Sequence, residues 1–214
     1  MKKLIIFDLD GTLLNTIYDL GEACNYALDL MGFQTHPITA YNLMVGNGIR
    51  KLMERAQPDA DQNTIDELLS HFKEYYNDHC TEHTKPYPGI TELLNRLKEN
   101  EIKIAVASNK YQAATTKIIN YFFPDIPFVA VEGQREGIPC KPDPSIIFSI
   151  LLQSPTPKND VLMVGDSAVD IETARRACVE SVGVTWGFRP VSEIRRAYPG
   201  TIIYKPEELY KFIE

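Results

Sequence analysis

The stretch Leu4-Ile5-Ile6-Phe7-Asp8-Leu9-Asp10-Gly11-Thr12-Leu13 decides how this chain folds. Its first four residues are apolar and are bounded by charge and glycine, which is typical of a short strand buried on both faces. Asp8 follows that strand directly, and in open α/β sheets ligands bind at this carboxyl end of the strands. We therefore expect the first strand to carry the functional site.

Asp8 and Asp10 form the first candidate pair of functional residues. In an extended chain their side chains share a face, and Gly11 permits the turn that must follow. Two carboxylates this close repel each other, so ionisation of both requires a nearby cation. Mg²⁺ fits, because it prefers oxygen ligands and leaves positions for phosphate oxygens. The alternative is a strand followed by an ordinary Asp-Gly turn.

Composition limits the classes of partner. The chain has 214 residues, of which 44% are hydrophobic and 24% charged, and a formal net charge of −7. These values are ordinary for a soluble globular protein, and the negative charge opposes a nucleic-acid or anionic-membrane partner. The cysteines are scattered and form no C-x-x-C pair, and the apolar run after Lys3 is too short for a signal peptide. We expect a cytoplasmic protein with no membrane or nucleic-acid partner; the oligomeric state stays open.

Residues 15–84 have helical periodicity throughout. Apolar residues recur every three to four positions over 17–31, 39–45, 49–56 and 63–79. Thr16 and Asp19 have the spacing of a capping box at the start of the first of these helices. Pro86 and Pro88 forbid a continuing helix, so we expect the helical region to end in a linker at residues 85–89.

From residue 90 onward helices and strands alternate. Strands are predicted over 102–107, 128–131, 161–164, 181–185 and 201–204, and helices over 90–99, 113–122, 144–152 and 168–178. Alternation with mostly apolar strands predicts a parallel sheet covered by helices on both faces. We expect an α/β core formed by residues 1–14 and 85–214, with an all-helical insertion at 15–84.

Three further polar clusters follow predicted strands. They are Ser108-Asn109, Lys141, and Gly165-Asp166-Ser167 with Asp170 one helical turn later. A hydroxyl and an amide can donate to phosphate oxygens, a lysine can neutralise a dianion, and Asp166 can complete a set of oxygen ligands. Taken singly, each has a structural alternative: a turn, a solvated loop and a helix cap.

In this order the four clusters resemble the motifs of the haloacid dehalogenase superfamily of phosphotransferases. The resemblance covers essentially the whole chain and implies a Rossmann-like core with an inserted helical cap. It implies that Asp8 is the nucleophile that forms an aspartyl phosphate, and that Asp10 is the general acid and then the base for water. It also implies a Mg²⁺ site made by Asp8, the backbone carbonyl of Asp10, and Asp166, which Asp170 supports.

The remaining implied roles concern the substrate. The resemblance assigns the transferring phosphoryl group to Ser108, Asn109 and Lys141, with Thr12 as a further substrate-binding residue. Within the superfamily, the segment Met44–Leu52 is similar to the cap of bacterial phosphoglycolate phosphatases. Arg50 in that segment is a candidate clamp for a carboxylate or a second phosphate, and a solvated helix position is its alternative.

The sequence therefore predicts a Mg²⁺-dependent phosphatase for a small phosphorylated metabolite, with 2-phosphoglycolate as the best single candidate. A phosphomutase of the β-phosphoglucomutase type is the first alternative, because it uses the same core and cap. A catalytically silent binding module is the second alternative, and the full set of carboxylates opposes it.

Overall fold

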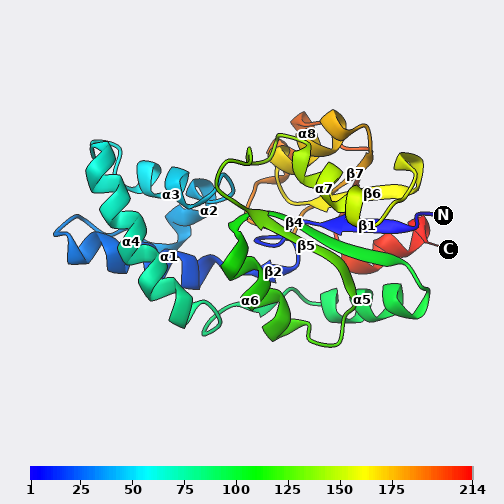
Figure 1. The fold of residues 1–214 in the computed structure, drawn as a ribbon, viewed down its shortest axis with the longest axis horizontal. Helices are drawn as coiled ribbons and strands as arrows, with labels where there is room; N and C mark the ends of the chain where they lie inside the picture. Colours follow the sequence, from blue (N-terminus) through cyan, green and yellow to red (C-terminus); the bar gives the residue numbers. More distant parts are fainter. Residues whose placement is uncertain (214) are drawn as a thin grey trace.

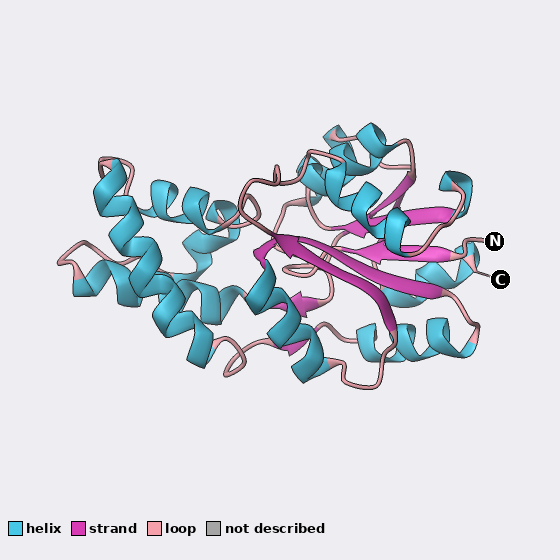
Figure 2. Cartoon of the chain, in the orientation of Figure 1, coloured by secondary structure: helices cyan, strands magenta, loops and turns pink. Residues whose placement is uncertain are grey.

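A six-stranded parallel sheet forms the centre of the molecule in the computed structural model, which describes residues 1–213 (Figures 1 and 2). The strand order is β5-β4-β1-β6-β7-β8, and every neighbouring pair is parallel. The strands are β1 (Leu4–Phe7), β4 (Lys103–Tyr111), β5 (Phe128–Gln134), β6 (Val161–Gly165), β7 (Glu180–Val184) and β8 (Thr201–Ile203). The predicted α/β class with a parallel sheet is confirmed.

Strand β1 is central and fully buried, as its apolar run predicts. Leu4 and Ile6 point to one face, where they pack with residues of α7 (Ser145–Gln153) and α8 (Ala168–Ala177). Ile5 and Phe7 point to the other face, where α5 (Ile90–Glu99) and α6 (Gln112–Phe122) lie. All four side chains have no exposed surface. The strict alternation of side chains along a strand thus explains why an unbroken apolar run is needed here.

A second group of helices lies beside the sheet, at its left in Figure 2. This helical block runs from Ile17 to His79 and contains α1 (Ile17–Leu30), a 3₁₀ turn (Ile38–Ala40), α2 (Tyr41–Met44), α3 (Ile49–Ala56) and α4 (Gln62–His79). Its apolar faces, such as Ala27 of α1 and Leu68 and Phe72 of α4, pack inward and are unexposed. The predicted helical character of this region is confirmed.

Two short strands connect the helical block to the core. Leu14–Asn15 (β2) pairs antiparallel with Lys85–Pro86 (β3), with Leu14 opposite Pro86 and Asn15 opposite Lys85. The expectation of a plain linker at 85–89 misses this ladder, because two-residue strands are too short to produce a periodic pattern. The chain therefore leaves and re-enters the core at adjacent points.

The capping box predicted at Thr16 is wrong. The Thr16 side chain makes no cap hydrogen bond and donates instead to Asp10 Oδ1 at 2.7 Å. The Asp19 carboxylate accepts from the backbone N–H of Thr84 at 2.9 Å and from its hydroxyl at 2.6 Å. Both side chains bond to residues outside the first turn of the helix, and the spacing of a capping box considers only residues within that turn.

Other differences lie at the ends of elements. Strand β4 continues to Tyr111, so Ser108 and Asn109 lie within the strand rather than after it. Helix α9 (Val191–Arg196) and the 3₁₀ turns Lys158–Asp160 and Pro206–Phe212 were not expected. No helix within residues 1–213 is both long and apolar enough to cross a membrane.

Candidate active site

Three buried carboxylates meet at the carboxyl end of the sheet. Asp8 follows β1 and its backbone N–H donates to Val164 O of β6 at 2.9 Å. Asp166 follows β6, and Asp170 lies in the first turn of α8. One carboxylate oxygen from each of the three lies within 4.8 Å of the others. Parallel strands thus bring together Asp8 and Asp166, as the sequence predicts.

Lys141 joins two of these carboxylates. Its Nζ lies 2.9 Å from Asp8 Oδ1 and 2.7 Å from Asp170 Oδ1, and it also donates to Ala107 O at 2.7 Å. The Asn109 side chain fixes the backbone at this point, because its Oδ1 accepts from Lys141 N at 2.8 Å and its Nδ2 donates to Lys141 O at 3.1 Å. The lysine is therefore held at both its backbone and its ammonium group.

Asp170 has two structural partners besides belonging to the acidic cluster. Its Oδ2 accepts from the hydroxyl and the backbone N–H of Ser167, at 2.6 and 3.1 Å, which closes a capping box at the start of α8. Its Oδ1 accepts from Lys141. Asp170 thus ties the orientation of Lys141 to the helix that follows Asp166.

Burial shapes the protonation of the cluster. Desolvation, and after it the charge of Asp170, raise the pKa of Asp8 to about 7 although Lys141 opposes the shift. Burial and the charges of Asp170 and Asp8 hold the pKa of Asp166 well above its usual range. Burial alone would lower the pKa of Lys141, but the carboxylates of Asp170 and Asp8 raise it. With all three carboxylates ionised against one ammonium, the cluster would carry two excess negative charges, which the raised pKa values of Asp8 and Asp166 oppose.

A divalent cation fits this site. The donor set consists of carboxylate oxygens, which Mg²⁺ prefers, and its charge would balance the excess. The surroundings keep Asp166 in place: its Oδ2 accepts from Phe188 N at 2.7 Å. A Cβ at Gly187 would lie 2.3 Å from Asp166 Oδ2, and one at Gly11 would lie 2.4 Å from it, so only glycine leaves room for this carboxylate.

Asp10 is placed differently from the other acidic residues. Its carboxylate is not part of the acidic cluster and faces Lys110, whose Nζ lies 3.0 and 3.1 Å from the two oxygens. Thr16 Oγ1 donates to the same carboxylate. The Lys110 ammonium also lies 4.7 Å from the ring centre of Tyr76 in α4. Sequence reasoning missed Lys110, although it directly follows Ser108-Asn109, because only the fold shows that this lysine is buried.

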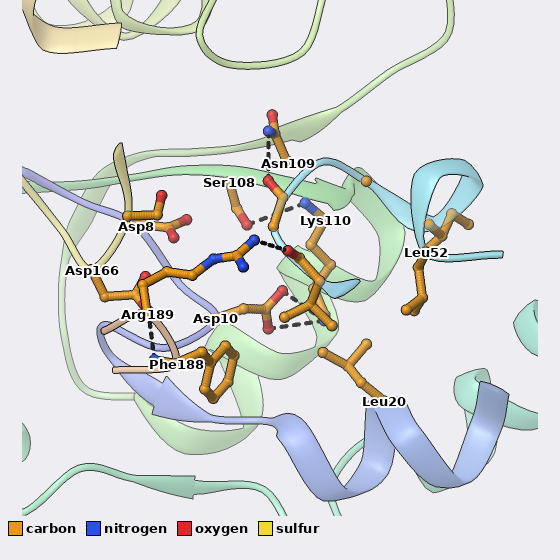
Figure 3. A pocket seen from close by; sticks show the side chains of 15 residues that line it. Asp8, Asp10, Leu20, Leu52, Ser108, Asn109, Lys110, Asp166, Phe188 and Arg189 are labelled. Carbon is orange, nitrogen blue, oxygen red and sulfur yellow. Dashed lines mark hydrogen bonds and ion pairs between the residues drawn. The ribbon is translucent and has the colours of Figure 1, made fainter. Parts of the chain in front are cut away.

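A small cavity of about 40 Å³ connects these groups to the helical block (Figure 3). Asp8, Asp10, Ser108, Asn109 and Asp166 line it, together with Lys110, Phe188 and Arg189 from the core. Val45, Gly46 and Gly48 line it from the helical block. Asn109 Nδ2 donates to Gly46 O at 3.0 Å, so the block is in direct contact with the core beside Asp8.

Two of the predicted substrate-binding residues do not line this cavity. Arg50 lies on α3 with an exposed side chain that pairs with Asp66 and donates to Gln62 Oε1 at 3.3 Å, both on α4. Thr12 is fully buried, its carbonyl accepts from Trp186 Nε1 at 3.0 Å, and its hydroxyl has no partner among residues 1–213. The solvated alternative weighed for Arg50 therefore describes its position.

Arg189 is a second residue that the sequence reasoning missed. It lies in the loop after β7, and its guanidinium donates to Leu43 O at 3.1 Å and to Val45 O at 2.7 Å. The signal was available, since residues 186–190 follow a predicted strand just as Asp8 and Asp166 do. A loop of Trp, Gly, Phe, Arg and Pro matches no phosphate-binding or metal-binding motif, so its sequence alone does not predict a role for Arg189.

Comparison with known proteins gives one consistent result. A sequence model of the family described as haloacid dehalogenase-like hydrolase matches residues 5–184. The chain is 32% identical over 206 residues to a phosphoglycolate phosphatase of Mesorhizobium japonicum, covering 94% of this chain and 90% of the other. It is 34% identical over 200 residues to one of Agrobacterium fabrum, covering 89% and 84%.

Solved structures agree with the sequence relatives. A candidate phosphoglycolate phosphatase from Lactobacillus delbrueckii subsp. bulgaricus superposes with a TM-score of 0.92 at 31% identity, covering 100% of this chain and 99% of the other. Another from Haemophilus somnus gives a TM-score of 0.93 at 27% identity, with 100% and 98% coverage. The similarity extends over the helical block as well as the sheet.

Proposed function

Since this chain belongs to the haloacid dehalogenase-like hydrolase family, we propose that it is a Mg²⁺-dependent phosphatase that hydrolyses 2-phosphoglycolate through an aspartyl phosphate. The assignment to phosphatases follows from the sequence relatives. The observation that carries the mechanism is the buried contact between Lys141 Nζ and Asp8 Oδ1 at 2.9 Å, beside Asp166 and Asp170. A carboxylate that is oriented by a buried ammonium suits nucleophilic attack on phosphorus.

In the first step, an Asp8 oxygen attacks phosphorus, a P–O bond to Asp8 forms, and the bond to the leaving oxygen breaks. Asp10 donates a proton to that leaving oxygen. Ser108 and Asn109 line the cavity beside Asp8, where hydroxyl and N–H groups can donate to phosphoryl oxygens. The Lys141 ammonium offsets the negative charge of the transferring group.

In the second step, Asp10 takes a proton from a water molecule whose oxygen attacks phosphorus. The P–O bond to Asp8 breaks, inorganic phosphate leaves, and the Asp8 carboxylate is restored. Lys110 Nζ lies 3.0 Å from Asp10 Oδ1 and holds this carboxylate in place for the step.

The acidic cluster supports the metal assignment. Asp8 and Asp166 would hold Mg²⁺, and Asp170 would keep Lys141 and the start of α8 in place around it. When bound, Mg²⁺ acts as a Lewis acid toward the phosphoryl oxygens and lets Asp8 stay ionised at neutral pH. The carboxylate of Asp10 faces Lys110, which agrees with a ligand role for its backbone carbonyl alone.

The helical block is proposed to act as a cap, formed by residues 15–84 over a core of 1–14 and 85–214. The β2–β3 ladder supports these boundaries, since both crossings between the two parts lie there. Asn109 and Arg189 hold the 43–48 segment, which is the end of α2 and the turn after it, against the core. A segment docked in this way excludes water from the cavity during phosphoryl transfer.

The relatives bear on the substrate. Both sequence relatives are phosphoglycolate phosphatases, which supports a two-carbon phosphomonoester over the hexose phosphates that a mutase of the β-phosphoglucomutase type needs. The relatives with phosphatase names likewise oppose a silent binding module.

The test is a comparison of phosphate release from 2-phosphoglycolate, glucose 6-phosphate and β-glucose 1-phosphate with Mg²⁺ present. We expect kcat/KM for 2-phosphoglycolate to exceed the other two by at least about tenfold, which is about 1.4 kcal/mol in transition-state binding. Conversion of β-glucose 1-phosphate to glucose 6-phosphate without release of phosphate would identify a mutase instead.

A further inference from the structure

We propose that Arg189 binds a carboxylate on the leaving group of the substrate, and that it links this recognition to the docking of the 43–48 segment. The inference rests on the proposed phosphatase function and deepens it, because it names the residue that would recognise the carboxylate of 2-phosphoglycolate. Arg189 lines the cavity that holds Asp8, and its side chain is only 12% exposed. Figure 3 shows it extended from the loop after Phe188 toward the helical block.

The charges around the cavity single out Arg189. Lys110 is paired with Asp10 at 3.0 Å, and Lys141 is paired with Asp8 and Asp170 at 2.9 and 2.7 Å. Arg189 forms a long ion pair with Glu193, whose Oε1 lies 3.9 Å from Nε, too far for a hydrogen bond, and accepts instead from Ala168 N at 3.3 Å. Its hydrogen-bond partners Leu43 O and Val45 O are neutral carbonyls. An anionic ligand group would give Arg189 a charged hydrogen-bond partner, which the long contact with Glu193 does not.

The guanidinium has donors to spare for such a group. It carries five N–H bonds, and the two carbonyl contacts use one on each terminal nitrogen. The remaining donors include one on each terminal nitrogen and the one on Nε, which suits the two oxygens of a carboxylate. A bound carboxylate and the docked segment can therefore share the same side chain.

A second arginine strengthens the case for an anion here. Arg55 of α3 donates to Met44 O at 2.6 Å and to Asn47 Oδ1 at 2.7 Å, so two guanidinium groups contact the 43–48 segment. Burial, and after it the positive charge of Arg189, lower the pKa of Arg55. A negative charge next to Arg189 would relieve that repulsion, so substrate binding and docking of the segment would favour each other.

The experiment compares substrates that differ only in the carboxylate. We would measure kcat/KM for 2-phosphoglycolate against ethyl phosphate, and for 2-phospholactate against isopropyl phosphate, in the unaltered protein and in Arg189→Gln and Arg189→Lys. Arg196→Gln is the matched control, because Arg196 is an exposed arginine on α9. Circular dichroism melts would check that each variant folds.

We expect the unaltered protein to prefer each carboxylate substrate over its neutral partner by about tenfold to a hundredfold. Arg189→Gln should lose most of that preference, with a larger loss on each carboxylate substrate than on its neutral partner, because the loss on the neutral substrates reports only the contacts with Leu43 O and Val45 O. Arg189→Lys should retain part of it, since it keeps the charge and loses the bidentate geometry. Arg196→Gln should leave the preference unchanged. Equal losses on charged and neutral substrates would overturn the inference and reduce Arg189 to a docking contact.

The result separates this inference from the function it rests on. Release of phosphate from neutral and carboxylate substrates at equal rates would keep the phosphatase assignment and overturn the role of Arg189. If no substrate is turned over, the phosphatase proposal fails, and binding still tests Arg189. For that case we would titrate Asp8→Asn and the Asp8→Asn/Arg189→Gln double variant with 2-phosphoglycolate by calorimetry. A dissociation constant raised by less than about threefold in the double variant would overturn the inference, and a rise of tenfold or more would support it.

Discussion

Lys141 Nζ lies 2.9 Å from Asp8 Oδ1, although the two residues are 133 positions apart in the chain. The lysine reaches this point because its ammonium is also fixed by Asp170 and by Ala107 O. Three oxygen acceptors hold the charge in one place before any substrate arrives. In the proposed mechanism, such preorganisation means that little rearrangement is needed when negative charge develops on the phosphoryl group.

Replacing Asp8 by asparagine should abolish turnover while the protein still folds. The amide is nearly isosteric and can still accept from Lys141, but it is a far poorer nucleophile than a carboxylate. We expect phosphate release to fall by at least about a thousandfold, as for removal of other catalytic nucleophiles. The measurement is phosphate release by a purified variant with an unchanged circular dichroism spectrum. Substantial retained activity would rule out the aspartyl phosphate.

Mg²⁺ should stabilise the protein more at pH 8 than at pH 5.5. The pKa of Asp8 is raised from its ordinary value of 3.8 to about 7, so the folded state binds more protons than the unfolded state between these values. Without metal, the free energy of unfolding therefore falls as the pH rises through this window. Mg²⁺ replaces those protons, and its stabilising effect grows as they leave.

The measurement is the melting temperature with and without Mg²⁺ at each pH. Metal at ten times its dissociation constant should add about 1.4 kcal/mol, or about 3–6 °C for a chain of this size. Asp166→Asn is the control and should remove most of the gain, since it deletes one of the clustered carboxylates. Chelation with EDTA should stop catalysis, and added Mg²⁺ should restore it. An equal gain at both pH values would contradict the linkage.

Lys110→Met should reduce catalysis without unfolding the core. Its removal leaves Asp10 with Thr16 as its remaining partner among the contacts described, so the proposed proton donor is less firmly held. We expect kcat/KM for ethyl phosphate to fall by about tenfold to a hundredfold. The loss on p-nitrophenyl phosphate should be smaller, because that leaving group departs without a proton. Lys117→Met is the matched control, since this exposed lysine also contacts the helical block and lies outside the cavity.

Tyr76→Phe should stabilise the protein slightly. The Tyr76 hydroxyl is buried and has no hydrogen-bond partner in the described part of the chain, while its ring lies under the Lys110 ammonium. Deleting the hydroxyl removes an unsatisfied group, which we expect to raise the melting temperature by about 2–4 °C. Tyr41→Phe is the opposite control, because its hydroxyl donates to Asn25 Oδ1 at 2.6 Å and its loss should lower the melting temperature. A lower melting temperature for Tyr76→Phe would show that the hydroxyl is satisfied.

Arg50→Ala should change kcat/KM by no more than about twofold on either 2-phosphoglycolate or p-nitrophenyl phosphate. Its exposed pairing with Asp66 is the kind of surface contact that contributes about 0–1 kcal/mol to stability. Kinetics on both substrates check this directly. A selective loss on 2-phosphoglycolate would restore Arg50 as the carboxylate clamp and count against Arg189.

The sequence was most informative where a local pattern and the fold impose the same requirement. The apolar run before Asp8 predicts a buried central strand because side chains on both of its faces must be covered, and that strand brings Asp8 next to Asp166. The helical block was predicted for the same reason, because each helix must bury one apolar face, and this gives apolar residues every three to four positions. These features depend on which side chains are buried, and the order of apolar and polar residues along the sequence indicates that directly.

Long-range polar contacts were the part that the sequence could not show. Arg50 and Arg189 have the same side chain, and only the path of the chain decides that one faces α4 and the other faces the cavity. Lys110 and Thr16 likewise depend on where Asp10 points, which no local spacing encodes. The predicted capping box at Thr16 and the predicted end of β4 are wrong for a related reason. Partners from distant parts of the chain replace the local ones that the sequence pattern assumes.

The antiparallel pair formed by Leu14–Asn15 and Lys85–Pro86 has an evolutionary consequence. Its two strands lie side by side, about 5 Å apart as in any sheet, so the inserted segment leaves and re-enters the core at a single point. A segment inserted at one such point can lengthen, shorten or be exchanged for another without shifting the register of the parallel sheet. Substrate preference can then diversify by changes in the inserted segment, while the residues proposed to act on the phosphate, which follow β1 and β6 or lie within β4, stay where they are.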